Sequence, residues 1–145
     1  MTTLVQSRPA TESISVRPER LSVHFRVGMP GLEQYHDYTL VAVDDSALYW
    51  LECDDEPSIA LPLAEAFTVE PAYGFELYSS DARALGLELA EDALTLVVLT
   101  VAPNDGTVTA NLFAPVVINR VTGAAQQVIL DGTPWSLRQP VGTLA

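Results

Sequence analysis

The 145-residue sequence has one cysteine, two histidines, no lysine and no long apolar run. Because Cys53 stands alone, it excludes an internal disulfide and fits a reducing compartment. No apolar run approaches the roughly 20 residues that a membrane-spanning helix needs. The N-terminus lacks a basic segment followed by an apolar stretch, so no signal peptide is evident. These absences predict a cytoplasmic protein that does not act on membranes.

Basic residues are scarce and unevenly placed. Seven arginines stand against 19 acidic residues, the net charge is −12, and four of the arginines lie in the first 26 positions. From Val27 to Asn119 there are 16 acidic residues and one arginine, Arg83, a balance of −15. Nucleic-acid binding relies on Lys and Arg, so none is expected. Such a surface attracts basic proteins, although acidic residues also serve solubility alone.

Motifs of common catalytic and metal sites are missing. His24, His36 and Cys53 are not spaced as zinc ligands are. There is no Gly-x-Ser-x-Gly elbow and no Gly-rich phosphate loop before a helix. We therefore expect no metal, no cofactor and no enzymatic activity. His24 is expected to face solvent from a strand, and Cys53 to be a small apolar residue of the interior.

The densest acidic segment is 52–56, Glu-Cys-Asp-Asp-Glu, which Pro57 closes as a turn. It lacks the Gly-punctuated alternation of a calcium loop. Consecutive loop residues also do not establish two carboxyl groups that face each other across a cleft. A solvated loop is the plain interpretation, but Glu52, Asp54 and Asp55 are also candidates for contact with a basic partner.

Turn-forming residues divide the chain into short segments with strand character. The turn signals are 28–31, 44–46, 54–57, 104–106 and 131–134. The predicted strands are 21–27, 38–43, 48–51, 59–63, 94–101, 108–112, 115–119 and 126–130. Their number and spacing indicate an antiparallel sandwich or barrel. The segment 94–101, LTLVVLTV, is almost wholly apolar, which predicts an internal strand covered on both faces.

Only two segments suggest a helix. Residues 79–86, SSDARALG, offer Ser and Asp as caps and Gly86 as the end, and residues 63–67 suggest a shorter turn or a loop. The polar residues 1–13 are expected to be disordered, and 141–145 to form a C-terminal tail. Residues 14–140 are then predicted to form one all-β, mainly antiparallel, barrel-like domain with one or two short helical turns, its interior filled by side chains.

The two tryptophans are the largest apolar side chains. Trp50 lies between Tyr49 and Leu51 in a predicted strand, so we expect it in the core with its N–H bonded at the periphery. Trp135 follows a turn and either closes one end of a barrel or anchors a partner. The structural role is favoured.

The stretch 107–130, TVTANLFAPVVINRVTGAAQQVIL, reads as two apolar strands joined by the turn 120–123. Pro115 removes a ladder N–H, so we expect it at an edge, a strand start or a bulge. Asn111 and Asn119 bracket the apolar run. They either satisfy backbone groups left unpaired near Pro115 or belong to a surface specified for binding.

Three ordered segments share their pattern with a known family. Residues 25–32, FRVGMPGL, are similar to its Phe-x-x-Gly-Ile/Leu-Pro-Gly-Phe, and 109–119, TANLFAPVVIN, to its Thr-Ala-Asn-Leu-x-Ala-Pro-Ile-Val-Ile/Val-Asn. Residues 126–130, QQVIL, with 135–138, WSLR, are similar to its Gln-x-Val/Ile-x-Leu and later Tyr-x-x-Arg. The chain thus resembles the flagellar assembly factor FliW family. Leu32 replaces the family's Phe, Trp135 its Tyr, and the lysine of its second hairpin turn is absent.

The resemblance implies a non-enzymatic, barrel-like protein that exchanges partners in the cytoplasm. Such a protein binds newly made flagellin and, once flagellin is exported, binds the RNA-binding regulator CsrA and relieves repression of flagellin translation. RNA exclusion by mimicry of phosphates and by binding beside the RNA site both remain open. The free protein is expected to be a monomer. The alternative is a small-molecule-binding β-barrel with a deep apolar cavity.

The working surface is expected at the hairpin and the acidic loops, with neutral hairpin residues exposed. The candidate partner-binding residues are Asn111, Leu112, Phe113, Pro115, Asn119, Gln127, Glu52, Asp54 and Asp55. Replacing Asn111 or Asn119 by Ala is expected to weaken binding and leave the fold largely intact. A loss of stability with unchanged affinity would instead indicate a structural role.

Overall fold

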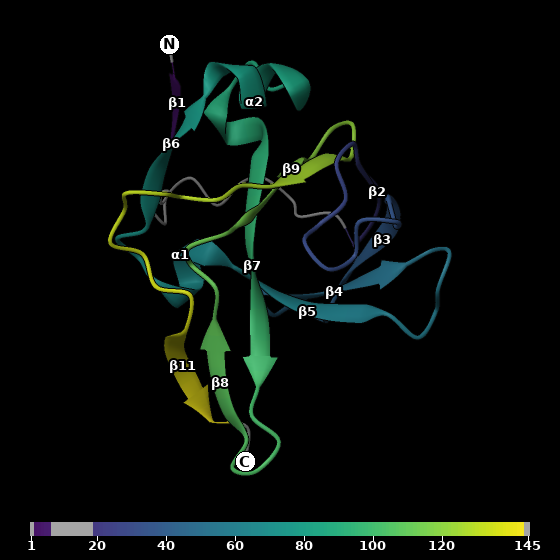
Figure 1. The fold of residues 1–145 in the computed structure, drawn as a ribbon, viewed down its shortest axis with the longest axis vertical. Helices are drawn as coiled ribbons and strands as arrows, with labels where there is room; N and C mark the ends of the chain where they lie inside the picture. The colour runs from purple at the N-terminus through teal and green to yellow at the C-terminus, as the bar shows by residue number, and fades with distance from the viewer. Residues whose placement is uncertain (1, 7–18, 144–145) are drawn as a thin grey trace.

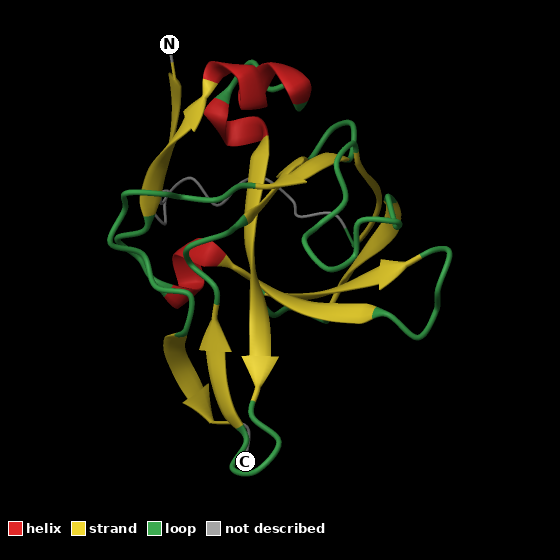
Figure 2. Ribbon diagram, viewed as in Figure 1, coloured by secondary structure: helices red, strands yellow, loops and turns green. Residues whose placement is uncertain are grey.

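The computed structural model describes residues 2–6 and 19–143, which contain eleven strands and three short helices (Figures 1 and 2). The strands are β1 (Thr2–Gln6), β2 (Arg20–Phe25), β3 (Asp37–Ala42), β4 (Leu48–Cys53), β5 (Ala60–Glu65), β6 (Gly74–Tyr78), β7 (Ala93–Val101), β8 (Thr107–Ala110), β9 (Val116–Asn119), β10 (Ala124–Gln127) and β11 (Gln139–Thr143). The helices are α1 (Ala66–Val69), α2 (Ser79–Ala84) and the 3₁₀ helix η2 (Ala90–Asp92). Within this part of the chain no helix is long and apolar enough to cross a membrane. The predicted fold class is confirmed.

Seven of the strands close into a barrel. Their order is β7-β5-β4-β3-β2-β10-β9, and β9 pairs again with β7. Neighbours in the barrel run antiparallel, except β2 and β10, which are parallel. The second half of β7 leaves the barrel and pairs with β8, which pairs with β11; we call this part the projection, at the bottom of Figure 1. Strands β1 and β6 form a separate two-stranded sheet.

Side chains that point into the barrel form an inner core. Strand β4 shows the alternation, because Tyr49, Leu51 and Cys53 are buried here while Leu48 and Trp50 face outward. The other buried members are Val23, Phe25, Met29, Tyr38, Leu40, Leu63, Leu94, Leu96, Val116, Ile118 and Ala125. The barrel interior is therefore filled by side chains, as predicted, which opposes the alternative of a ligand-holding barrel.

An outer core lies between the barrel wall and the layer that contains β6, α1 and α2. Strand β7 supplies both cores, because Leu94 and Leu96 point into the barrel while Ala93 and Val97 point outward. The other buried members of the outer core are Ala64, Ala66, Tyr73, Phe75, Leu77, Ala82, Leu85, Ala110, Leu112, Val117, Val128 and Leu130. Burial on both faces explains the apolar run over residues 94–97, where the predicted internal strand is confirmed, whereas Val98 and Leu99 are partly exposed and Thr100 and Val101 are exposed in the projection.

Gly123 allows the parallel contact between β2 and β10. It lies in the turn after β9 at a φ of +84°, and a Cβ built there would come within 2.0 Å of the Ser22 carbonyl oxygen. The Gly123 carbonyl accepts the His24 N–H at 2.9 Å. Any other residue here would be strained by the positive φ and would clash with the Ser22 carbonyl, so only glycine fits. Gly123 therefore lets the hairpin of β9 and β10 pack against β2.

Both ends of the chain form strands that the sequence did not predict. Residues 2–6 form β1, so the expected disorder over 1–13 is wrong for them, and residues 1 and 7–13 lie outside the described residues. Residues 139–143 form β11, so the domain continues past residue 140 and the expected tail is wrong for 141–143. Pairing with β6 and β8, rather than local propensity, specifies these two strands.

Trp50, the start of α2 and strand β6 differ from what the sequence predicted. Trp50 is 44% exposed instead of buried, because its neighbours Tyr49 and Leu51 take the inward positions of β4. Helix α2 begins at Ser79 without a side-chain cap, although Gly86, at a φ of +68°, follows it as predicted. Strand β6 was missed because only Phe75 and Leu77 mark it in a short segment between a loop and α2.

Candidate partner-binding surfaces

The predicted binding hairpin is largely buried. Leu112 is fully buried in the outer core and Pro115 is buried immediately before β9. The Pro115 carbonyl accepts the Val128 N–H at 2.9 Å, while its missing N–H falls at the strand start, as predicted. Leu112 and Pro115 therefore pack within the fold and do not present a surface to a partner.

Asn111 and Gln127 hold the connection between β8 and β9. The Asn111 Oδ1 accepts the Phe113 N–H at 3.1 Å and the Ala114 N–H at 3.0 Å. The Gln127 Nε2 donates to the Ala114 carbonyl at 3.0 Å. These are side-chain bonds to backbone groups left out of the strand ladders. Asn111, Phe113 and Gln127 nevertheless keep part of their surface exposed.

Asn119 joins α2 to the turn between β9 and β10. Its Nδ2 donates to the carbonyls of Leu85 and Gly86 at 2.9 and 3.3 Å, and its Oδ1 accepts the N–H groups of Val121 and Thr122 at 2.9 and 3.3 Å. The residue is only 3% exposed. The expectation that Asn119 is exposed on the hairpin is therefore wrong, because its amide is used to pair backbone groups.

Tyr73 and Trp135 pack against each other at the outer core, and each donates a hydrogen bond to a backbone carbonyl. The Tyr73 hydroxyl donates to the Leu112 carbonyl at 2.7 Å, and the Trp135 Nε1 donates to the Gly74 carbonyl at 2.9 Å. Their rings meet edge to face with centroids 4.8 Å apart. Burial raises the pKa of Tyr73 well above its usual range. Trp135 has the favoured structural role, on the outer core rather than at a barrel end.

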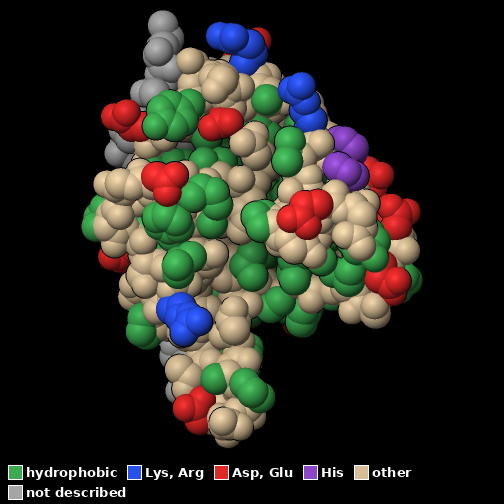
Figure 3. Space-filling model, viewed as in Figure 1, with side chains coloured by type: hydrophobic (Ala, Val, Ile, Leu, Met, Phe, Trp, Pro, Cys, Tyr) green, Lys and Arg blue, Asp and Glu red, His purple; other side chains and the backbone are tan. Residues whose placement is uncertain are grey.

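The acidic segment at the end of β4 and in the loop before β5 lies at the surface, where Glu52, on β4, and Asp54 and Asp55, in the loop, are all exposed. The Thr39 hydroxyl donates to the Asp54 Oδ1 at 2.8 Å, which orients this carboxylate. Acidic side chains gather over β2–β5 on the right of Figure 3. The three predicted acidic residues therefore share one end of the β3–β4–β5 sheet, which we call the acidic end.

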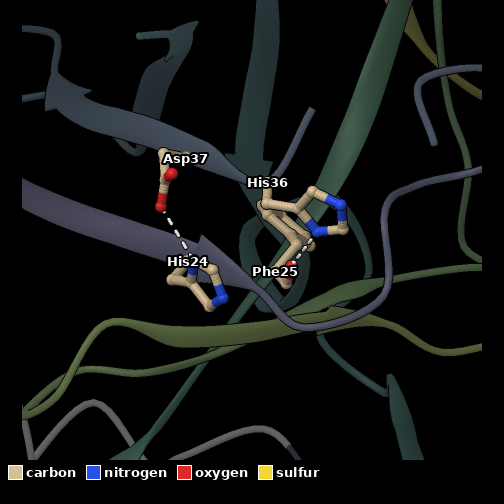
Figure 4. Close-up of polar contacts among 4 residues, drawn as sticks. All are labelled: His24, Phe25, His36 and Asp37. Atoms are coloured by element: carbon tan, nitrogen blue, oxygen red, sulfur yellow. Dashed lines mark hydrogen bonds and ion pairs between the residues drawn. The ribbon is translucent and has the colours of Figure 1, made fainter. Parts of the chain in front are cut away.

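The acidic end continues to Asp37 and the two histidines (Figure 4). The His24 Nδ1 donates to the Asp37 Oδ1 at 2.7 Å, and His24 faces solvent as predicted. The His36 Nδ1 donates to the Phe25 carbonyl at 2.6 Å, which ties the loop before β3 to the end of β2. Among the described residues, no group of three His, Cys, Asp or Glu side chains is arranged to hold a metal ion.

An apolar groove lies at the other end of β4, between the β4–β5 hairpin and the projection. Its volume is about 490 Å³. Trp50 and Pro62 are opposite each other on β4 and β5, and Val101 and Val108 are opposite each other on β7 and β8. Sequence reasoning missed this groove, although Leu48 and Trp50, on either side of the buried Tyr49 in β4, are the signal for an outward apolar pair.

Comparison with known proteins agrees with this architecture. The sequence model of the FliW protein family matches residues 6–141. The chain belongs to the FliW family. A crystal structure of the flagellar assembly factor FliW superposes with a TM-score of 0.75 at 30% identity, covering 88% of this chain and 89% of the other. The fold described above is therefore the FliW fold.

Curated FliW relatives span most of the chain. The flagellar assembly factor FliW of Anoxybacillus flavithermus is 34% identical over 116 residues, 80% of each chain. That of Geotalea uraniireducens is 32% identical over 118 residues, 81% of this chain and 72% of the relative. That of Bacillus licheniformis is 31% identical over 125 residues, 86% of this chain and 87% of the relative.

Proposed function

We propose that this FliW-family chain is a cytoplasmic, non-enzymatic flagellar assembly factor that binds flagellin and antagonises a CsrA-type translational regulator. When flagellin is exported, the freed protein binds the regulator and relieves repression of flagellin synthesis. The observation that carries the proposal is the acidic end, where Glu52, Asp54 and Asp55 are exposed together on a FliW fold. A regulator that binds RNA presents basic surface, and this end is complementary to it.

The regulator contact is proposed at the acidic end. Asp54 is oriented by Thr39, and Glu56 accepts the Ser58 hydroxyl at 2.7 Å, which lowers the pKa of Glu56. The negative charge of these carboxylates attracts a basic surface over the screening length of about 8 Å. Salt is therefore expected to slow association more than it speeds dissociation.

The flagellin contact is proposed along the partly exposed border of the hairpin, at Phe113, Asn111 and Gln127. The buried residues Leu112, Pro115 and Asn119 would then position this border without touching flagellin. Apolar burial carries no comparable ionic screening, so dissociation of the flagellin complex should respond less to salt. Flagellin displaces the regulator either by overlap or by coupling between the two sites.

A titration of both partners over a salt series tests this function. Purified flagellin and the CsrA-type regulator from one flagellated bacterium are each bound to the protein at low and physiological ionic strength. The expected result is a salt-dependent association rate for the regulator, a nearly salt-independent dissociation rate for flagellin, and displacement of the regulator by flagellin. A ternary complex that forms without loss of affinity would contradict the proposed exchange.

A further inference from the structure

The apolar groove is a part of the outer sheet face that the covering layer does not reach. The outer core covers Ala64 and Val97, whereas further along β5 and β7 the outward side chains are left partly or fully exposed. The groove is formed by Leu48, Trp50, Pro62, Leu99, Val101 and Val141. In Figure 3, hydrophobic atoms line the lower border of the barrel body beside the projection.

Four large apolar side chains in the groove are exposed together, Leu48, Trp50, Val101 and Val141. They come from three strands that are far apart in the sequence, β4, β7 and β11, and they converge on one hollow. Single exposed apolar residues are common on proteins, but a contiguous apolar hollow is typical of an interaction site. An exposed tryptophan is also the residue type that most often dominates binding energy.

Acidic residues lie in the turns that end at the groove. Asp44 and Asp45 lie between the groove residues Val43 and Leu48, and Asp105 lies between Val101 and Val108. Thr107 donates its hydroxyl and its N–H to the Asp105 carboxylate at 2.6 and 3.0 Å, which lowers the pKa of Asp105. The groove is therefore apolar at its centre and anionic at two of its borders.

Among the described residues that line the groove, none is basic. Arg20 is separated from Trp50 by Val41, which pairs with both of them in the sheet. Arg138 lies immediately before β11, beyond Gln139. A second copy of the chain, at a net charge of −12, would bring acidic borders against each other, and like charges oppose such contact. Charge complementarity instead favours a cationic occupant.

We propose that this groove binds an amphipathic peptide segment of a partner protein, with apolar side chains against Trp50 and lysine or arginine against Asp44, Asp45 and Asp105. The assignment goes beyond the proposed function, because the groove lies at the start of β4 and the acidic end lies at its other end. It adds a second recognition surface whose specificity combines apolar burial with charge. The two surfaces are separable by mutation.

The probe is a short fluorescent peptide of leucine and lysine with the two residue types on opposite faces, and binding is measured by anisotropy. Trp50→Ser should weaken binding by about tenfold or more, which is about 1.4 kcal/mol, because it truncates a central aromatic anchor. Trp50→Phe should restore most of the affinity. Val121→Ser is the matched control, since Val121 is 74% exposed in the turn after β9, outside the groove, and should change nothing.

The charge of the occupant is tested separately. Asp44→Asn with Asp45→Asn should weaken binding at low salt and reduce its salt dependence, and Asn tolerates the positive φ of +46° at position 44. A leucine and glutamate peptide of the same pattern should not bind. Unfolding midpoints confirm that each variant is folded.

Three results would overturn the proposal. The first is equal binding of the leucine and lysine peptide to the protein and to Trp50→Ser. The second is equal binding of the glutamate peptide. The third is a dimer of the protein alone, in sedimentation, that Trp50→Ser dissociates, because the occupant would then be a second copy. None of these measurements uses flagellin or the regulator, so they can fail while the proposed function stands.

Discussion

Asn119 and Glu52 lie near the ends of two strands of the same barrel, but their surroundings differ. Asn119 is 3% exposed and makes four hydrogen bonds to backbone groups. Glu52 is exposed on the outward row of β4, at the acidic end. The Asn119 side chain is engaged in hydrogen bonds inside the protein, whereas the Glu52 side chain is available to solvent and to partners.

The comparison separates two uses of polar residues in this fold. In the hairpin region, from β8 to β10, the side-chain amides of Asn111, Gln127 and Asn119 bond to backbone groups. At the acidic end the carboxylates make few internal contacts and set the local charge. Substitution should therefore change stability in the first region and partner encounter in the second.

The largest expected effect is on the buried part of the hairpin region. Leu112→Ala should lower the free energy of unfolding by about 2–5 kcal/mol, because it removes a fully buried side chain and leaves a cavity. The loss of unfolding free energy is measured by urea unfolding. Leu89→Ala, at an exposed position, is the matched control and should cost less than about 0.5 kcal/mol. Equal losses of unfolding free energy for Leu112→Ala and Leu89→Ala would contradict a structural role for the buried part of the hairpin region.

Asn119→Ala should lower the free energy of unfolding by about 2–3 kcal/mol, since the buried Leu85 carbonyl after α2 and the partly buried Val121 N–H of the β9–β10 turn lose their side-chain partner. Asn104→Ala, in the exposed turn after β7, makes the same chemical change and should cost far less. Both are measured by urea unfolding. A stability loss for Asn119→Ala no larger than the control would restore the original expectation of a surface asparagine.

Two buried tyrosines, Tyr73 in the outer core and Tyr38 in the inner core, differ in whether their hydroxyl groups have a hydrogen-bond partner. Tyr73→Phe should cost about 1–2 kcal/mol, because the Leu112 carbonyl loses its 2.7 Å hydrogen bond. Tyr38→Phe should be close to neutral, since the Tyr38 hydroxyl, in the inner core, has no partner among the described residues. Thermal or urea unfolding distinguishes them. The reverse order of costs would contradict the hydrogen-bond assignment.

Tyr38 also predicts how the stability of the protein changes at alkaline pH. Burial raises the pKa of Tyr38 to about 12, from an ordinary value of 10 in the unfolded chain. Its contribution is therefore complete below pH 10 and is lost as the pH rises toward 12, by about 1.4 kcal/mol at pH 11. Unfolding free energy measured from pH 9 to 11 should fall less steeply in Tyr38→Phe than in the parent protein. Equal slopes would contradict the raised pKa.

The sequence predicted most of the barrel because its strands carry local signals. Alternation marks β4, the continuous apolar run marks β7, and Gly106 and Gly123 end their turns at positive φ. The sequence did not predict β1 or β11. Their pairing depends on distant strands, and residues 139–143, QPVGT, carry weak strand propensity.

The candidate site was predicted only in part. The exposure of Glu52, Asp54 and Asp55 follows from a turn rich in acidic residues, and the structure bears it out. The burial of Asn119 does not follow from local sequence, because its partners Leu85 and Gly86 are more than 30 residues away. The groove was missed for a related reason, since Trp50 and Val101 are brought together only by the projection.

The smallest effect on stability is expected at the acidic end, and it provides the central test. The association rate constant of a CsrA-type regulator is measured with the triple variant Glu52→Gln, Asp54→Asn, Asp55→Asn and with Asn119→Ala, at temperatures where both are folded. The triple variant should associate about three- to tenfold more slowly at low salt, with unfolding free energy within about 0.5 kcal/mol of the parent. Asn119→Ala should associate at the parent rate. Slow association for Asn119→Ala, together with parent-like association for the triple variant, would contradict the account.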